Sequence, residues 1–222
     1  MKIKNKLLIV GAFPKNKNQT IYGGQLTACN SLIDSYLSDK YEIFTIDSTT
    51  LSIPPPNLLI RTFFATKRLC IFFLKLIIKK PAIVIIFVAD KYSAIEKGIM
   101  ILISKLFNIP VMLFPRAGAL IKQYQRNQYF KSFLNFTFKK SKIFLCQGSS
   151  FQKFAIKELS FSKDKCPIIP NWTANKSYLQ IGEKRIFSNF QNDLNILFIG
   201  WIEDFKGIKE ILQAVKILKN KQ

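Results

Sequence analysis

The sequence predicts an α/β fold: a doubly wound, mostly parallel sheet with helices on both faces. Short apolar runs rich in β-forming residues recur along the chain. Near-continuous apolar runs of this kind are typical of strands that are buried on both faces of a parallel sheet. Longer stretches with helical spacing separate the runs, and this strand–helix alternation is the pattern of parallel strands joined by crossover helices. We therefore expect a Rossmann-like domain of about six strands.

The six expected strands follow from where the apolar runs lie. The first begins directly after a basic N-terminal segment, and the last is bounded on both sides by proline. Their positions are residues 7–10, 41–47, 82–88, 111–114, 143–146 and 167–170.

Helical patterns lie between these runs. Three prolines at residues 54–56 precede the second helix, and Asn108 and Pro110 end the third, since proline cannot continue a helix. The expected helices cover residues 25–37, 58–80, 93–107, 123–140 and 150–159.

The end of the chain predicts the start of a second domain. An apolar run at residues 195–200 reads as a buried strand, and apolar positions from Ile208 to Leu218 mark one face of a helix. The stretch before them is polar and has no clear period. We therefore expect an N-terminal domain at 1–180, a linker at 181–194 and a truncated second domain at 195–222. Its apolar side chains should be partly exposed, namely Leu197, Ile199, Ile211 and Val215.

Charge and composition limit the function classes. The formal net charge is +21, from 34 basic and 13 acidic residues, which implies attraction to a polyanionic partner. The chain has no histidine, which excludes a Ser-His-Asp triad and histidine metal ligands. Its four cysteines are widely spaced, so we expect core thiols and no metal site.

Two helices combine basic and aromatic residues, at 58–80 and 123–142. Such helices can lie on an anionic membrane surface, but ordinary amphipathic helices with solvated lysines give the same pattern. No apolar run is long enough to span a membrane, and the N-terminal run is too short for a signal peptide. We expect a cytoplasmic protein, free or peripheral on the inner membrane. No nucleic-acid recognition motif is present, so we expect no nucleic-acid partner.

Glycines precede two of the helices. Gly23 and Gly24 lie before the first helix, where they would let the backbone approach an anion at the helix N-terminus. A flexible loop is the alternative, because the spacing fits neither a dinucleotide nor a Walker-type motif. Lys206 and Gly207 precede the last helix. A lysine there opposes the helix dipole unless it serves a ligand.

Four further candidates follow strands. Loops at the carboxyl ends of parallel strands line the ligand crevice of open α/β sheets. Arg116 could bind a phosphate or a carboxylate there, or be solvated; Asp90 could be a general base, or could cap a helix or form a salt bridge. Ser149 or Ser150 would cap the helix that follows, and this is the favoured role because a nucleophilic serine would lack a histidine base. Asn171 could bond to a loop or to a ligand.

Taken in order, these motifs resemble the family 4-type glycosyltransferases of the GT-B fold. Gly23-Gly24 matches the family's glycine-rich loop. Ser149, the helix after it and then Pro170-Asn171-Trp172 match the family's serine–helix–"vipNgv" run. Residues 196–200 match the opening strand of the family's second domain, and Lys206-Gly207 matches the "KG" that follows that strand.

The resemblance implies two Rossmann-like domains and a retaining, metal-independent transfer that needs no cofactor. The donor would be a nucleotide-sugar, and the acceptor a lipid-linked saccharide in bacterial surface-polysaccharide biosynthesis. On this basis we assign Lys206, Gly207, Gly23 and Gly24 to the donor side, and Arg116, Asp90, Asn171 and Ser149 to the acceptor side or the cleft.

The sequence also departs from the family pattern. Trp201 stands where the family usually has a basic residue, and no histidine follows the fourth strand. The ExxxxxxxE segment that holds the donor would fall beyond Gln222. Three interpretations stay open: a glycosyltransferase, an inactive remnant that binds an acceptor or a membrane, and an unrelated α/β protein that binds a phosphorylated ligand.

Overall fold

The chain forms two compact units in the computed structural model, Met1–Thr173 and Ala174–Gln222. The structure describes residues 4–13, 23–50, 52, 55–89, 92–172, 176–185, 196–200, 202 and 206–219.

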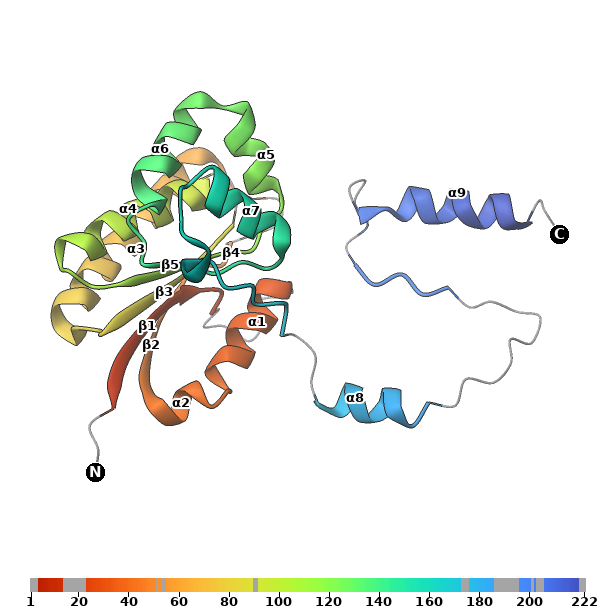
Figure 1. The fold of residues 1–222 in the computed structure, drawn as a ribbon, viewed down its shortest axis with the longest axis horizontal. Helices are drawn as coiled ribbons and strands as arrows, with labels where there is room; N and C mark the ends of the chain where they lie inside the picture. The colour runs from red at the N-terminus through yellow and green to blue at the C-terminus, as the bar shows by residue number, and fades with distance from the viewer. Residues whose placement is uncertain are drawn as a thin grey trace. The chain divides into compact units, whose positions relative to one another are not determined.

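The first unit is built on a five-stranded, all-parallel sheet with the strand order β2-β1-β3-β4-β5 (Figure 1). The order reverses at β1, because the chain first places β2 on one side of β1 and then β3 on the other. The strands are β1 (Asn5–Gly11), β2 (Tyr41–Asp47), β3 (Ile83–Val88), β4 (Val111–Pro115) and β5 (Ile143–Phe144).

Helices cover both faces of this sheet, which confirms the predicted doubly wound α/β fold. Helix α1 lies on one face, and α3, α4 and α6 lie on the other (Figure 1). The helices of this unit are α1 (Gly24–Ile33), α2 (Leu37–Lys40), α3 (Leu58–Lys79), α4 (Tyr92–Leu106), α5 (Ala119–Arg126), α6 (Gln128–Phe138) and α7 (Ser149–Lys157), with a 3-10 turn, η1 (Lys163–Lys165).

The core has two layers because side chains alternate along each strand. In β1, Leu8 points to the layer that also holds Phe72 of α3 and Phe138 of α6. Its neighbour Ile9 points to the opposite layer, which holds Cys29 of α1. A continuous apolar run therefore serves both layers, as the sequence predicted.

Helix α1 approaches the end of β1 very closely at Gly11. A Cβ atom at this position would lie 2.6 Å from Cys29 Sγ, so glycine is required for the contact. The carbonyl of Gly11 also accepts hydrogen bonds from Ser48 N at 2.7 Å and Ser48 Oγ at 3.0 Å. These contacts hold the carboxyl ends of β1 and β2 together.

The single helix predicted at residues 123–140 is wrong, because the structure has two helices there. Asn127 adopts an extended backbone with φ −128° and ψ 112°. Its N–H bonds to Gln123 O and ends α5, while its side chain accepts a hydrogen bond from Phe130 N at 2.9 Å and begins α6. Asparagine is well suited to such a junction because it is a strong N-cap.

The predicted sixth strand at residues 167–170 is reduced to a single parallel bridge between Ile168 and Cys146. Two backbone hydrogen bonds hold it, from Cys146 N to Pro167 O and from Ile169 N to Cys146 O. Prolines on both sides prevent a longer ladder, because proline has no N–H to donate.

In the second unit the predicted helix is present as α9 (Ile208–Lys219). A further helix, α8 (Lys176–Glu183), spans the expected boundary between the N-terminal domain and the linker. The predicted strand is wrong: residues 196–200 are not in a strand, and no strand occurs in the described part of this unit that could pair with them. Leu197 is 81% exposed and Ile199 86%, with Val215 also exposed and Ile211 half-buried. The expected exposure of this apolar set is confirmed.

Candidate functional site

A cleft of about 690 Å³ opens at the carboxyl edge of the sheet. Ala12, Ser48 and Ala89 line it, and they directly follow β1, β2 and β3. The cleft therefore spans the point where the strand order reverses. Open α/β sheets bind their ligands at this kind of position, because the connections on either side of it leave in opposite directions.

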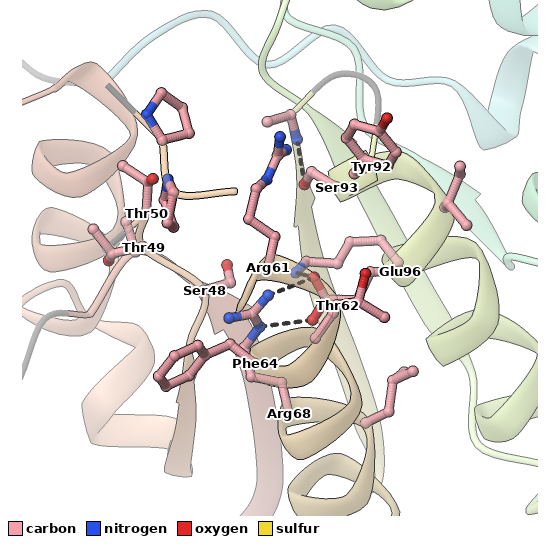
Figure 2. Close-up of a pocket in the computed structure, with 18 of the residues that line it drawn as sticks. Ser48, Thr49, Thr50, Arg61, Thr62, Phe64, Arg68, Tyr92, Ser93 and Glu96 are labelled. Carbon is pink, nitrogen blue, oxygen red and sulfur yellow. Dashed lines mark hydrogen bonds and ion pairs between the residues drawn. The ribbon is translucent and has the colours of Figure 1, made fainter. Parts of the chain in front are cut away.

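Two walls and a floor define the cleft (Figure 2). Thr49 and Thr50, after β2, form one wall together with Pro55 and Pro56. The start of α4 forms the other wall, with Tyr92 and Ser93. Helix α3 lies between these walls, and the side chain of Arg61 rises from it into the space between them (Figure 2).

The floor holds a charged network that joins α3 to α4. Arg68 donates from Nε to Glu96 Oε1 at 2.7 Å and from Nη2 to Glu96 Oε2 at 2.9 Å. Lys97 Nζ lies 3.1 Å from Glu96 Oε2 and is almost completely buried. Because Glu96 is already engaged by two cations, we interpret the network as the scaffold of the cleft.

The environment shifts the pKa of both buried members of this network. Burial lowers the pKa of Lys97, although the charge of Glu96 acts against that shift. Burial alone would raise the pKa of Glu96, but the charges of Lys97 and Arg68 outweigh it and the pKa is lowered. Glu96 is therefore ionised at neutral pH.

Arg61 differs from the other two cations of the cleft. Its guanidinium carbon lies 4.6 Å from the centre of the Tyr92 ring, and no ion pair joins it to a carboxylate in the described part of the chain. The described lining has three cations, Arg61, Arg68 and Lys97, and one carboxylate, Glu96. The described lining thus carries excess positive charge, and Arg61 is its cation that no carboxylate of the described residues engages.

Asp47 organises the loops beside the cleft. Its Oδ1 accepts hydrogen bonds from Phe13 N and Thr49 N, both at 2.9 Å, and from the Thr49 hydroxyl. One carboxylate thereby connects the segment after β1 with the segment after β2. We regard Asp47 as a positioning residue for the cleft wall.

A second cluster, of one arginine and two aromatic rings, lies at the carboxyl end of β4 around Arg116. Its guanidinium carbon is 5.2 Å from the ring centres of both Phe114 and Trp172. Arg116 Nη1 is buried and has no hydrogen-bond partner among the described residues, and burial lowers the pKa of this side chain. Trp172 is itself held in place, because its Nε1 donates to Ala28 O at 2.9 Å and its ring stacks on Phe114 at 5.3 Å.

Cys29 connects the Arg116 cluster with the cleft. Its Sγ accepts a hydrogen bond from Ala12 N at 3.4 Å, and Ala12 lines the cleft. Burial raises the pKa of Cys29 to about 11, although the charge of Arg116 acts against that shift. The thiol is therefore protonated at neutral pH and is not a nucleophile.

The residues proposed from the sequence separate into several places. Gly23 lines the cleft, whereas Gly24, the first residue of α1, is not part of the lining. Arg116 belongs to its own cluster at the end of β4. Asn171 is exposed beside that cluster and accepts a hydrogen bond from Gln147 Nε2 at 2.8 Å. Asp90 lies outside the described residues.

Ser149 is an exposed residue that opens α7, and its predicted role as the helix cap is wrong. The N-cap is Gly148, whose backbone is extended. Lys206 and Gly207 belong to the second unit and precede α9; Gly207 has φ +78°, a conformation that favours glycine.

The sequence did not predict that the charged residues of α3 and α4 meet in one cleft, namely Arg61, Arg68, Glu96 and Lys97. Arg61 and Arg68 stood out only as part of a basic, aromatic helix, and the Glu96-Lys97 pair was not singled out. The available signal was this adjacent pair of opposite charges inside an otherwise apolar helix. Charged residues in such a helix are buried only when they are paired, so the pair indicates an interhelical network.

No protein-family model and no curated protein matches the chain. Within the described residues there is also no group of three side chains that could hold a metal ion.

Proposed function

We propose that the first unit is the acceptor-binding side of a retaining, nucleotide-sugar-dependent glycosyltransferase of bacterial surface-polysaccharide biosynthesis. In this proposal the cleft holds a lipid-linked saccharide acceptor through its phosphate groups. The resemblance of the sequence motifs supports the reaction class. The position and charge of the cleft support the binding of a phosphorylated ligand.

The observation that carries the proposal is Arg61, a cation without a carboxylate partner in the described part of the chain, inside a cleft at the reversal of the strand order. A guanidinium matches the oxygens of a phosphate with two parallel hydrogen bonds. The ring of Tyr92 would hold the guanidinium plane in place when the phosphate binds.

Other lining groups suit the remainder of such a ligand. Gly23 is the N-cap of α1, and no side chain of the described residues caps this helix, so its first N–H groups can face an anion. The proposal therefore uses Gly23, which the resemblance assigns to the donor side, for the ligand of this cleft. Pro55, Pro56 and Leu58 provide apolar surface on the opposite side for carbon atoms. The hydroxyl of Thr50 is engaged with Ser52 O at 3.2 Å and supports the wall.

In this mechanism the chain's own residues bind and orient. Arg61 holds the acceptor phosphate, the Arg68–Glu96–Lys97 network fixes α3 against α4, and Asp47 fixes the loop that carries Thr49. The donor would bind through Lys206 and Gly207 of the second unit, as the resemblance implies. We assign no general base, because no side chain of the described cleft is placed for that role.

The same observation supports a second candidate, an α/β protein that binds a phosphorylated ligand and transfers no sugar. A related possibility is a module that binds only the acceptor or the membrane. These candidates agree on the phosphate in the cleft and differ on the donor, so separate titrations distinguish them.

Calorimetric titration of the full chain tests both steps. Farnesyl diphosphate is the acceptor probe, and a panel of UDP-, GDP- and ADP-sugars tests the donor. We expect Arg61→Gln to weaken farnesyl diphosphate binding about tenfold or more, because one charge-assisted contact is lost. Arg126→Gln is the matched control, since Arg126 is exposed and lies outside the cleft lining.

Each outcome has a distinct meaning. Binding of both probe classes supports the transferase. Binding of farnesyl diphosphate alone supports a phosphate-binding protein and removes the donor part of the proposal. Equal binding by wild type and Arg61→Gln, or no binding at all by the folded chain, contradicts the cleft as the ligand site.

A further inference from the structure

Helix α3 has an unusual outward face. The helix is 22 residues long and mostly apolar, yet only Phe72 and Leu76 are fully buried. Leu59 is 82% exposed and Phe63 66%. Monomeric proteins rarely leave so long an apolar helix face in water without a binding role for it.

The exposed side chains form a continuous stripe along the helix. Five of them follow one another at intervals of three, four or seven residues, which are one or two helical turns, and therefore share one face. Arg61 and Arg68, which face the cleft and α4, lie on the opposite side of the helix. The α3 stripe consists of Leu59, Phe63, Cys70, Leu74 and Ile77.

The apolar surface continues from α3 onto the end of α4. The rings of Phe73 and Phe107 meet edge to face at 5.6 Å, and Leu106 beside them is exposed. A shallow groove follows this contact, lined by Thr66, Leu69, Cys70, Phe73, Leu74 and Ile103. The surface is therefore a broad patch and not a single ridge.

The exposed charged side chains of α3 and α4 are all positive. Helix α3 contains no Asp or Glu. The exposed lysines are Lys67 on α3, Lys80 directly after α3 and Lys105 at the end of α4. The only acidic residue of α4, Glu96, is buried in the network described above. An apolar stripe with exposed lysines and no exposed carboxylate on its two helices fits a negatively charged, apolar partner.

We propose that the α3 stripe docks this protein on the surface of an anionic lipid membrane, with the helix lying in the plane of the interface. Phe63, Leu74 and Ile77 would enter the acyl boundary, and Lys67 and Lys80 would reach the phosphate headgroups. None of the described helices is long and apolar enough to cross a membrane. This proposal goes beyond the proposed function and holds or fails without it.

Helix α6 serves as an internal comparison. Its sequence has the same basic and aromatic character, but Leu134, Thr137 and Phe138 are buried in the core. Phe136 is 60% exposed, close to the exposure of Phe63, but on its face of α6 the only other large exposed hydrophobic side chain is Tyr129, two turns earlier, so the exposed pair is much shorter than the α3 stripe. The structure therefore selects α3, and α6 supplies matched control positions.

The first experiment uses Cys70 as a built-in probe. Cys70 is exposed within the α3 stripe, whereas Cys29, Cys146 and Cys166 are buried. A thiol-reactive, environment-sensitive fluorophore on Cys70 should shift to the blue and brighten with phosphatidylcholine vesicles that contain phosphatidylglycerol. The same label in Cys70→Ser/Phe136→Cys should respond much less. Equal responses at both positions would overturn the proposal, as would no response at Cys70.

The second experiment leaves the protein unlabelled. Vesicle co-sedimentation should show about tenfold weaker binding for Phe63→Ser, because a large apolar side chain no longer enters the lipid. Phe136→Ser should bind as the wild type does. Equal loss in both variants, or loss in neither, would overturn the proposal.

Analytical ultracentrifugation separates a lipid from a second copy of the chain. We expect the same monomeric behaviour of wild type and Phe63→Ser in the absence of vesicles. Self-association that Phe63→Ser abolishes, together with no vesicle binding, would overturn the membrane proposal and assign the α3 stripe to a dimer interface.

Discussion

Glu96 shows how one buried carboxylate determines the local architecture. It receives two hydrogen bonds from Arg68 of α3 and contacts Lys97 of its own helix. Replacing one member of such a buried network leaves the others without a counter-charge, which costs more than the network contributes as a whole. The cleft floor therefore depends on all three residues together.

We predict a specific pH dependence for this carboxylate. Burial opposes ionisation, but Lys97 and Arg68 lower the pKa of Glu96 below its ordinary value of 4.5. A carboxyl group whose pKa is lower in the folded state than in the unfolded state stabilises the fold at any pH above its unfolded-state pKa. This stabilisation is lost as the pH falls through the folded-state pKa. Chemical unfolding of wild type should therefore lose stability as the pH falls below 4.5.

Glu96→Gln is the test of this assignment. At neutral pH the variant should be less stable by about 3 kcal/mol, because Lys97 remains buried without its counter-charge. Its stability should fall less steeply than that of wild type in the acid range. Parallel pH profiles for the two proteins would contradict the role given to Glu96.

Three cysteines are buried core thiols as predicted, but the prediction is wrong for Cys70, which is exposed. We therefore expect the cysteines to differ sharply in reactivity. Burial raises the pKa of Cys29 to about 11 and that of Cys146 to about 12, and it also raises the pKa of Cys166. We therefore predict one maleimide adduct on the native chain, at Cys70, and four adducts in denaturant. Mass spectrometry of the intact protein counts them. Rapid modification of a second cysteine in the native state would contradict the burial of the other three.

At the scale of elements, α4 and α6 pack through a glycine. A Cβ atom at Gly98 would lie 2.7 Å from Phe133 Cε1 and 2.9 Å from Thr137 Oγ1. The close contact brings α6 onto α4, and α4 in turn carries Tyr92 and Glu96 to the cleft. The position of α4, and of the cleft wall that it forms, thus depends on Gly98 having no side chain where α6 packs.

We predict that Gly98→Ala destabilises the protein by about 1–3 kcal/mol, because overpacking outweighs the better helix propensity of alanine. Gly118→Ala is the control, since a Cβ atom there meets nothing within 4 Å and the backbone has φ −62°. Thermal and urea unfolding measure both variants. Equal stability of Gly98→Ala and wild type would show that α6 can move away from α4 at little cost.

At the scale of the whole molecule, the chain consists of two units of different character. The first has a parallel sheet with a core on each face. The described part of the second has two helices and exposed apolar side chains such as Leu197 and Ile199. Cooperative protection from proteases requires buried backbone and side chains, which the first unit has in abundance.

Limited proteolysis should therefore cut within Ala174–Gln222 first and leave a resistant fragment close to Met1–Thr173. A low concentration of a nonspecific protease, with mass spectrometry of the products, identifies the fragment. Uniform resistance of the whole chain would contradict this division into two units.

The sequence by itself determined the fold class, because near-continuous apolar runs such as that of β1 are stable only when both sheet faces are covered. It also placed Arg116 and Gly23 at the carboxyl edge of the sheet, since strand direction alone decides which loops lie there. The run at residues 196–200 has the same local pattern but does not form a strand, because backbone pairing needs a partner that local pattern cannot supply.

Only the tertiary structure decided which side of each helix is buried. Helices α3 and α6 have similar composition, yet Phe63 faces solvent while Phe138 is in the core, because packing depends on what the sheet and α4 present to each helix. The same packing brings Arg61, 35 positions before Glu96, into the cleft that this carboxylate supports. Distances between residues so far apart in the chain arise from the assembled core, and no local pattern encodes them.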